Sequence, residues 1–515
     1  MPFIALGTVS GRPLYEQIYA AVRDHILSGR LAGGAKLASS RELADDLGVS
    51  RFTVVTAFDA LRAEGYITAA VRGGTFVTHV LPDHHVRAPF PKAVRGSRPK
   101  TEPVGHPKAG MSARGRGIES TSITGPRSAS NSPRPFHPRR APLDLFPVPI
   151  WSKLVRREWR LRRHEMLDYG EPAGLRGLRE AIAQHAGSTR GVECTANQVI
   201  VTSGAQQAFN LIFQLLLDPG DTAWIEEPGY RDARAALAAC GAIAMPVPVD
   251  ANGIVVDAGI ATAPGAKLAY VSPSHQYPTG VTMSTSRRLD LLQWAHRSGA
   301  WIVEDDYDSY FRYHGRPLPA VQRLELDHLR ARGASSTDAR VIYVGTFSKT
   351  MFPSLRLGYC IVPLGLSDAF ANARAIADRN SSMCDQAALE CFITEGHYDR
   401  HLRRVRAACL DRYEAIVHAA NRHLAGVVTL SPMNAGTHVV GRLARGLPPA
   451  TTVERLARDA GLVVFPLSRY CINRPARDAL ILGYGGSTPQ AIRAGVQRLA
   501  RVIVSERSAS DRHPE

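Results

Sequence analysis

A stripe of apolar residues at helical spacing marks the start of the chain: Leu14, Ile18, Val22 and Ile26. Residues four apart share one face of an α-helix, so the stripe predicts an amphipathic helix that ends near Gly29. A second helix is expected over residues 39–47, with a serine as N-cap and Gly48 after its last turn. A third helix begins at Ser50 and stops at Gly65.

Two short alternating segments follow the third helix. Residues 66–68 and 75–77 flank the turn Arg72-Gly73-Gly74, which predicts a two-stranded wing. The elements together predict a winged helix-turn-helix whose third helix reads double-stranded DNA with its N-terminal residues. Arginine suits guanine edges and phosphates, and threonine suits phosphates and methyl groups. The candidate DNA-binding residues are Ser39, Arg41, Arg51, Thr53, Thr56, Arg72 and Gly74. The alternative is a three-helix packing module whose arginines are only solvated.

The larger part of the chain alternates apolar, strand-like runs with helical segments. Such alternation is typical of an α/β fold with a mostly parallel sheet and flanking helices. The predicted layout has four parts. They are the winged helix-turn-helix at 1–80, a linker at 81–141, a large domain with a small C-terminal lobe at 142–505, and a disordered tail at 506–515.

The predicted linker is rich in proline and strongly basic. Residues 82–140 contain ten prolines, twelve lysines and arginines and three acidic residues, a net charge of +9 out of +17 for the chain. A stretch without apolar periodicity cannot bury enough surface to fold, so it is expected to act as a tether. Its charge either adds nonspecific affinity for DNA or only aids solubility.

Candidate functional residues lie at four predicted strand ends. Lys349 follows a buried-type strand, where an open α/β sheet collects ligand-binding groups and an amine can form a Schiff base with an aldehyde. A phosphate-binding P-loop is excluded because Ser348, and not glycine, precedes the lysine. A Ser203-Gly204 turn suits a phosphate at a helix N-terminus. Carboxylates end the strand at 301–306, and a polar turn follows the strand at 268–271. The four together predict a phosphorylated pyridine aldehyde as cofactor.

From about Leu145 onward these motifs resemble the fold-type I aminotransferases, which use pyridoxal 5'-phosphate. The resemblance implies that Lys349 forms the internal aldimine and that Asp305 pairs with the pyridine nitrogen. It also implies that Tyr307 donates to the phenolic oxygen, that Tyr230 stacks on the ring and that Tyr169 reaches the partner subunit's phosphate. The phosphate contacts implied in the same way are Ser203, Gly204, Ala205 and Arg356. Thr346 and Tyr277 complete the expected cofactor contacts.

Two departures from the aminotransferase pattern bear on activity. Tyr277 stands where many of these enzymes carry an asparagine, so one contact to the phenolic oxygen is lost or is replaced by His275 or Gln276. The late strand at 480–484 lacks the arginine that usually binds the substrate carboxylate. Three arginines lie upstream of that strand and could reach in from a loop, although surface charge is the favoured interpretation for any one of them: Arg469, Arg474 and Arg477. Without a fixed bidentate partner for a carboxylate, efficient turnover of ordinary amino acids is not expected.

The N-terminal motif, residues 37–54, resembles the GntR family of bacterial repressors. Its fusion to an aminotransferase-like domain is similar to the MocR subfamily of transcription regulators. That resemblance implies a head-to-tail homodimer and a small amine or amino-acid effector, or pyridoxal phosphate itself, that sets DNA binding. The competing hypothesis is an active aminotransferase with an accessory DNA-binding domain. The regulator is favoured, with residual half-reactions at Lys349 and Asp305 still expected.

Composition bears on the cellular compartment and on metal and membrane binding. Seven cysteines with no CxxC pair or metal-spaced cluster favour reduced thiols in a cytoplasm, and no metal site is expected. The first residues are not expected to form a signal peptide, and the apolar run 211–217 is too short to span a membrane. The pattern identifies neither the effector nor the operator, nor whether the protein activates or represses.

Overall fold

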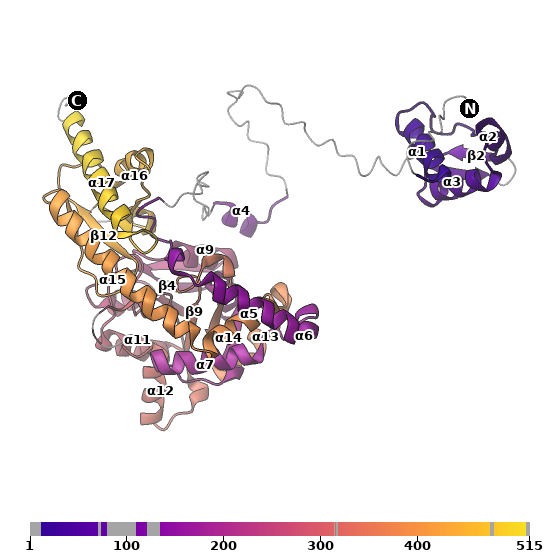
Figure 1. Ribbon diagram of the computed structural model, residues 1–515. Coiled ribbons are helices and arrows are strands. Elements are labelled where there is room, and N and C mark those ends of the chain that lie inside the picture. The colour runs from indigo at the N-terminus through magenta and orange to yellow at the C-terminus, as the bar shows by residue number, and fades with distance from the viewer. Residues whose placement is uncertain are drawn as a thin grey trace. The chain divides into compact units, whose positions relative to one another are not determined.

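The computed structural model describes residues 12–70, 74–79, 110–120, 134–313, 315, 318–473 and 478–510. The chain divides into two compact units, Met1–Pro107 and Lys108–Glu515. Both are drawn in Figure 1, coloured by position along the chain.

The first unit is a winged helix-turn-helix, as predicted. Its elements in chain order are α1 (Leu14–Leu27), α2 (Ser40–Leu47), α3 (Arg51–Ala63), β1 (Ile67–Ala70) and β2 (Gly74–Val77). A capping box opens α2, in which the Ser39 hydroxyl accepts from the Glu42 amide and Glu42 accepts from the Ser39 amide. Gly48 ends α2 with a φ of 65°, a left-handed conformation that favours glycine. The wing strands are antiparallel, with Ile67 opposite Val77.

A single apolar core holds these helices together. Ile18, Val22 and Ile26 of the predicted stripe are buried in it, and Val54 and Phe58 of α3 pack against them. Leu14 is 45% exposed, because it is the first residue of α1 and precedes the turn that faces the core. The buried faces leave the first turn of α3 at the surface.

An eight-stranded sheet forms the centre of the second unit. Its order is β3 (Val199–Thr202), β10 (Gly358–Ile361), β9 (Val341–Thr346), β8 (Trp301–Asp306), β7 (Leu268–Val271), β4 (Thr222–Glu227), β5 (Ile243–Asp250) and β6 (Gly253–Ile254). β10 and β6 run antiparallel to their neighbours, and the other strands share one direction. The prediction of a mostly parallel sheet is confirmed.

Helices cover both faces of this sheet, because successive strand residues point to opposite sides. Ile342 packs with Phe209 and Ile212 on one face, whereas Tyr343 packs with Leu178 on the other. The helices before the small lobe are α4 (Ala113–Ser120), α5 (Val148–Leu161), α6 (Arg163–Leu167), α7 (Arg176–Arg190), α8 (Ala205–Leu216), α9 (Arg231–Cys240), α10 (Val256–Thr262), α11 (Thr285–Ser298), α12 (Val321–Ala331), α13 (Ser367–Asp378) and α14 (Met383–Thr394). Short 3-10 helices lie at Leu143–Leu145, Ala196–Gln198, Ser309–Phe311, Ser336–Asp338, Pro353–Leu355, Leu364–Leu366 and Leu467–Tyr470.

The small C-terminal lobe is a four-stranded antiparallel sheet backed by long helices. Its strands, in sheet order, are β11 (Val428–Leu430), β12 (His438–Leu443), β14 (Ala479–Gly483) and β13 (Phe465–Pro466). Its helices are α15 (His397–His423), α16 (Ala450–Asp459) and α17 (Pro489–Ser510). In Figure 1, α15 and α17 run side by side along this lobe, and their apolar faces share one core.

Parts of the predicted linker and tail belong to ordered elements. Phe136 is fully buried in the core of the small lobe, and its carbonyl accepts from the Gly483 amide at 2.9 Å. Residues 134–141 therefore lie against the small lobe, although the sequence places them in the tether. α4 also falls inside the predicted linker, and α17 continues to Ser510, five residues into the predicted tail.

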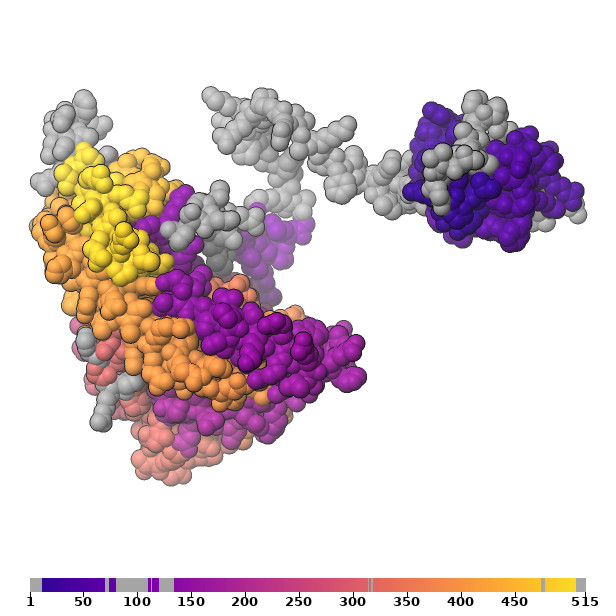
Figure 2. Space-filling model, in the orientation of Figure 1, coloured from indigo at the N-terminus to yellow at the C-terminus, as the bar shows by residue number. Residues whose placement is uncertain are grey.

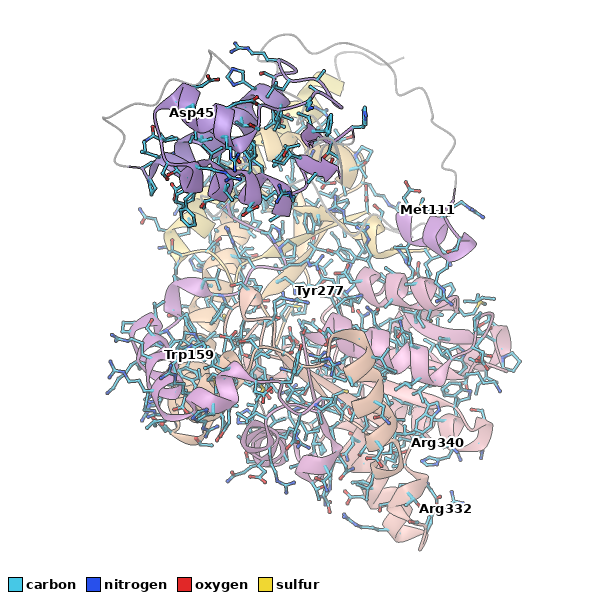
Figure 3. The ribbon with its side chains drawn as sticks, turned by 90° about the vertical axis from the view of Figure 1, so that its right-hand side faces the viewer. Asp45, Met111, Trp159, Tyr277, Arg332 and Arg340 are labelled. Atoms are coloured by element: carbon cyan, nitrogen blue, oxygen red, sulfur yellow. The ribbon has the colours of Figure 1, made fainter. Side chains whose placement is uncertain are left out.

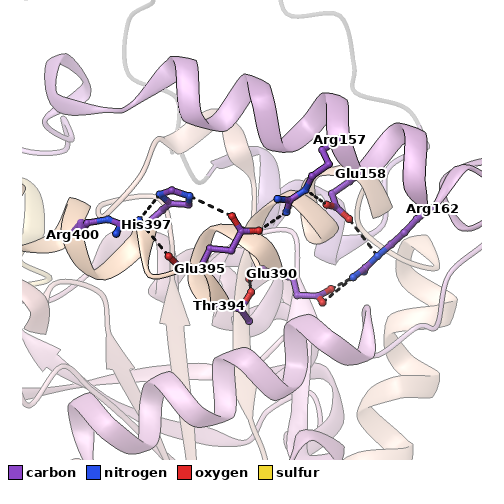
Figure 4. A network of polar contacts seen from close by, with 8 residues as sticks. All are labelled: Arg157, Glu158, Arg162, Glu390, Thr394, Glu395, His397 and Arg400. Carbon is purple, nitrogen blue, oxygen red and sulfur yellow. Dashed lines mark hydrogen bonds and ion pairs between the residues drawn. The ribbon is translucent and has the colours of Figure 1, made fainter.

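A charged network fastens α5 to α14 (Figure 4). Arg162 binds Glu390 through two hydrogen bonds at 2.8 and 3.0 Å, and also pairs with the buried Glu158 at 3.3 Å. Arg157 bridges Glu158 and Glu395 at 2.9 and 2.5 Å. In Figure 2, the magenta surface of α5–α7 and the orange surface of α14 and α15 adjoin on one face of the second unit.

Candidate functional site

A cavity of about 370 Å³ lies at the carboxyl ends of the central strands. Its lining residues are Arg139, Ala205, Gln206, Phe209, Tyr230, Asp232, Tyr277, Asp305, Tyr307, Thr346, Ser348, Lys349, Pro353 and Arg356. Eight of the eleven cofactor-contact residues predicted from sequence are among them. The three that do not line the cavity are Ser203, Gly204 and Tyr169.

Lys349 lies in the turn that follows β9. Burial, aided by the nearby Arg139 guanidinium and opposed by Asp308, lowers the pKa of its amine to about 8. An amine with a depressed pKa is unprotonated in a larger share of molecules near neutral pH, and the unprotonated form is the nucleophile.

Asp305, at the end of β8, is 5% exposed and has one unsatisfied oxygen. Its Oδ2 accepts from the Tyr270 hydroxyl, whereas its Oδ1 has no hydrogen-bond partner among the described residues. Burial raises the pKa of this carboxyl to about 7. A cationic N–H donor beside Oδ1 would satisfy the oxygen and favour the charged form, as a protonated pyridine nitrogen does. The chemistry of this end of the cavity therefore fits pyridoxal 5'-phosphate.

The other end of the cavity suits a phosphate. The Arg356 guanidinium donates to the Ser203 carbonyl at 2.6 Å, and α8 begins at Ala205 with its amide groups toward the same region. Gly204 has a φ of 91°, and a Cβ there would lie 3.3 Å from the Arg356 guanidinium. The Ser203 hydroxyl lies 3.1 Å from Ser381 Oγ, outside the cavity.

Tyrosine rings form much of the cavity wall. Tyr277 meets Tyr230 and Tyr307 edge to face, with ring centroids 5.8 and 6.0 Å apart. Its hydroxyl donates to Tyr470 of the small lobe at 2.9 Å. In Figure 3, Tyr277 lies inside the second unit, away from its periphery. The wall thus joins the large sheet to the small lobe.

The two residues proposed to replace the missing asparagine do not line the cavity. His275 Nδ1 bonds Asp308 at 2.7 Å and lies 3.1 Å from the Tyr307 hydroxyl. Gln276 donates to Glu226 and to the Pro228 carbonyl. His275 is thus connected to the cavity indirectly, through the hydroxyl of Tyr307, which does line it.

Two charged residues of the cavity were missed in the sequence. Arg139 Nη2 bonds Asp232 Oδ2 at 2.5 Å, and the Tyr230 hydroxyl donates to the same oxygen at 3.1 Å. Arg139 comes from the segment predicted as tether, where it looks like one basic residue among many. Asp232 had a detectable signal, because it lies only two residues after Tyr230, a predicted cofactor contact, and both line the cavity.

The carboxylate-binding arginine is absent from β14, whose five residues are all buried. Arg469, one of the upstream alternatives, pairs with Glu454 at 2.5 Å and lies over the Phe465 ring. It is therefore engaged within the small lobe. Arg474 and Arg477 lie outside the described residues.

Tyr169 is 78% exposed, and the Arg379 guanidinium lies 5.0 Å from its ring centroid. It does not reach the cavity of its own chain.

The predicted DNA-binding residues lie at the starts of α2 and α3 and in the wing. Arg41 and Arg51 are exposed, and Arg51 Nε lies 3.4 Å from Ser40 Oγ. The Ser50 hydroxyl caps α3 by accepting from the Thr53 amide, and Thr56 donates to the Phe52 carbonyl. Ser39 caps α2, and Gly74 is exposed at the start of β2. Arg72 lies outside the described residues.

Within the described ranges, no group of three or more histidine, cysteine or acidic side chains is placed to bind a metal ion. No helix in the same ranges is long and apolar enough to cross a membrane.

Two families match the chain. Residues 14–77 match the bacterial regulatory proteins of the gntR family, and residues 143–466 match aminotransferase class I and II. The chain is 38% identical to the "Probable rhizopine catabolism regulatory protein MocR" of Rhizobium meliloti, over 96% of this chain and 95% of the relative. It is 32% identical to the "HTH-type transcriptional regulator TauR" of Rhodobacter capsulatus, over 95% and 96%.

The "HTH-type pyridoxine biosynthesis transcriptional regulator PdxR" of Corynebacterium glutamicum is 30% identical over 95% of this chain and 96% of its own. Among solved structures, LysN, an alpha-aminoadipate aminotransferase from Thermus thermophilus, superposes with a TM-score of 0.64 at 28% identity. That match covers 72% of this chain and 91% of LysN. A multiple substrate aminotransferase from Thermococcus profundus gives 0.65 at 25% identity, over 78% and 98%.

Proposed function

We propose that this chain, which belongs to the MocR-type transcription regulators of the GntR family, senses an amine through pyridoxal 5'-phosphate held at Lys349. Its winged helix-turn-helix binds DNA, and its aminotransferase-like domain would decide how well it does so. The observation that carries the proposal is one cavity that contains both the Lys349 amine and the unsatisfied Oδ1 of Asp305.

Different residues of the cavity would bind different parts of the cofactor. Pyridoxal 5'-phosphate supplies an aldehyde that condenses with primary amines and a ring that withdraws electrons from the resulting bond. Lys349 would attach to the cofactor through Nζ, and Asp305 would accept from its ring nitrogen. Arg356 and the first amides of α8 would bind its phosphate. An effector amine would then compete with Lys349 Nζ for the same carbon.

A change at Lys349 can alter DNA binding only if the effector binds one arrangement of the protein better than another. The chain offers a direct connection, because residues 134–141 lead from the tether to the cavity and carry Arg139. We therefore propose that effector binding alters the C-terminal end of the predicted linker.

The competing function is an aminotransferase with an accessory DNA-binding domain. Such an enzyme needs a guanidinium that is free to bind the substrate carboxylate. β14 carries no arginine, and Arg139 is already paired with Asp232. A substrate carboxylate would thus meet no uncommitted guanidinium among the described cavity residues. Slow half-reactions remain compatible with Lys349 and Asp305.

A homodimer is part of the proposal. Large apolar side chains are exposed on the last turn of α5, on α6, on the following loop and on α13: Trp159, Leu161, Leu167, Tyr169 and Ile376, between 43% and 87%. Trp159 lies toward the periphery of the second unit in Figure 3. Such a surface is typical of one that a second copy covers. Tyr169 would then contact the partner's cofactor phosphate. We place the protein in the cytoplasm, where its DNA lies.

Absorbance spectroscopy tests the cofactor site directly. Full-length protein mixed with pyridoxal 5'-phosphate should show the visible absorbance of the bound cofactor, and Lys349→Ala should lose it while keeping its circular dichroism. A Lys153→Ala variant, which removes a lysine outside the cavity, is the control. An unchanged spectrum in Lys349→Ala would assign the cofactor to another lysine and overturn the proposal.

A further inference from the structure

One part of the cavity wall carries two opposite charges that cancel, those of Arg139 and Asp232. Arg139 and Asp232 form an ion pair at 2.5 Å, in which the carboxylate is 9% exposed and the guanidinium 42%. The Tyr230 hydroxyl donates to the same Asp232 oxygen. The pair leaves no excess positive charge on this part of the wall.

The other cations of the cavity are committed elsewhere. Among the described residues that line it, the positively charged groups are Arg139, Lys349 and Arg356. Arg356 donates to the Ser203 carbonyl beside the Gly204 turn, at the end that suits the phosphate. Lys349 is the amine that attaches to the cofactor. Arg139 is thus the remaining guanidinium that an effector could meet.

A carboxylate on the effector that accepted from Arg139 would lie beside the Asp232 carboxylate, since both would bind the same guanidinium. The repulsion between the two negative charges offsets the attraction to Arg139. A free carboxylate in solution also loses its own hydration on entering the cavity. Both costs oppose amino acids as ligands.

A hydroxyl group meets this wall without separating the pair. A guanidinium has five N–H donors, and the bond to Asp232 Oδ2 uses one, so a hydroxyl can accept from Arg139 and donate to Asp232. The hydroxyls of Tyr277 and Tyr470, 2.9 Å apart, add further donors and acceptors close to Arg139. Neutral polar groups therefore satisfy the wall better than a carboxylate does.

We propose that the effector is a primary amine that carries hydroxyl groups and no carboxylate, and that the Arg139–Asp232 pair selects it. This inference rests on the proposed function, since it concerns the amine that competes with Lys349. It goes further by giving the chemical class of that amine.

A matched pair of small amines tests the selection. Serine and 2-amino-1,3-propanediol differ only in whether a carboxylate or a second hydroxymethyl group is attached to the amine-bearing carbon. The full-length protein, loaded with pyridoxal 5'-phosphate, is titrated with each, and the change of the cofactor spectrum gives the dissociation constants. The diol is expected to bind about tenfold more tightly, because a partly screened contact between like charges costs on the order of 1 kcal/mol or more.

Two variants separate the role of the pair from general damage. Asp232→Asn keeps the shape of the side chain but releases Arg139, so serine should gain affinity relative to the diol and the preference should reverse. Arg140→Gln removes the adjacent basic residue, which does not line the cavity, and should leave the preference unchanged. Equal or tighter binding of serine by the natural chain, with no change of the ratio in Asp232→Asn, would overturn the inference.

The cofactor spectrum before titration separates failure of this inference from failure of the proposed function. Absence of the visible band in the natural chain would remove the proposed function, and the effector class with it. A normal band followed by preferential binding of serine would overturn only the effector class.

Discussion

At the scale of single residues, the site depends on two groups whose pKa values are shifted in opposite directions by burial. Lys349 is an amine with a lowered pKa, and Asp305 is a carboxyl with a raised one. Both shifts favour the neutral form of the group concerned. A cofactor that pairs with Asp305 and condenses with Lys349 relieves both costs together.

The lowered pKa of Lys349 predicts how attachment of the cofactor depends on pH. The unprotonated amine reacts, so the rate constant should rise with pH and level off above a midpoint near 8, compared with 10.5 for an ordinary lysine. Stopped-flow absorbance on cofactor-free protein measures this profile. A rate that still rises steeply above a pH of about 9.5, well past that midpoint, would contradict the assigned environment.

Asp305→Asn is expected to change stability and cofactor affinity in opposite directions. The raised pKa of Asp305 means that the folded state binds a proton more tightly than the unfolded state. Stability is therefore lost as pH rises from the ordinary value of 3.8 through about 7. At pH 8 the cofactor-free variant should be more stable by about 1–3 kcal/mol, the cost of an unsatisfied buried charge.

The affinity of the same variant for pyridoxal 5'-phosphate should fall, because asparagine cannot neutralise a pyridinium. Thermal unfolding without cofactor and equilibrium titration with it measure the two effects. A variant less stable than the natural chain at pH 8 would show that Asp305 Oδ1 is already satisfied. Asp306→Asn is not a suitable control, since Asp306 pairs with Arg190 at 2.7 Å.

At the scale of elements, α3 supplies an internal control for DNA recognition. Arg51 is exposed at the start of the helix, whereas Arg62 lies near its end and pairs with Asp59 at 2.8 Å. Arg51→Ala should weaken binding to the DNA upstream of the gene by about 1–3 kcal/mol, the usual value of a guanine contact. Arg62→Ala should have little effect. Equal loss in both variants, measured by fluorescence anisotropy at one salt concentration, would count against reading by the first turn of α3.

The elements that were predicted from the sequence are those with local signals. The helices of the first unit follow from apolar spacing and from the caps at Ser39, Gly48 and Ser50. The polar residues after β8 and β9 could be placed together because the carboxyl ends of parallel strands meet at one edge. Local pattern was sufficient in both cases.

Arg139 was missed because its position depends on contacts far away in the chain. Its segment is proline-rich and basic like the rest of the predicted linker, and contacts with distant residues, such as the pairing of Phe136 with Gly483, bring it to the cavity. The same reason explains Tyr470, which meets Tyr277 across the two lobes. Neither segment has a hydrophobic periodicity that would indicate these contacts.

At the scale of the whole molecule, the chain joins a DNA reader to a sensor through a basic segment that ends at the sensor's cavity. The predicted linker carries +9 of the chain's formal charge of +17, which either adds salt-dependent affinity for DNA or only aids solubility. What distinguishes a regulator from an enzyme with an accessory domain is the coupling of the two sites. Coupling is a difference in binding free energy, so it can be measured directly.

The most direct measurement of the central claim is the affinity of the full-length protein for its upstream DNA, with and without an amine, in the natural chain and in Lys349→Ala. With pyridoxal 5'-phosphate present, 2-amino-1,3-propanediol should change the dissociation constant of the natural chain by about 5- to 150-fold, the usual range of coupling between sites. Lys349→Ala should bind DNA with no response to the amine. An equal response in both proteins, or none in the natural chain while its cofactor spectrum responds to the amine, would contradict sensing through Lys349.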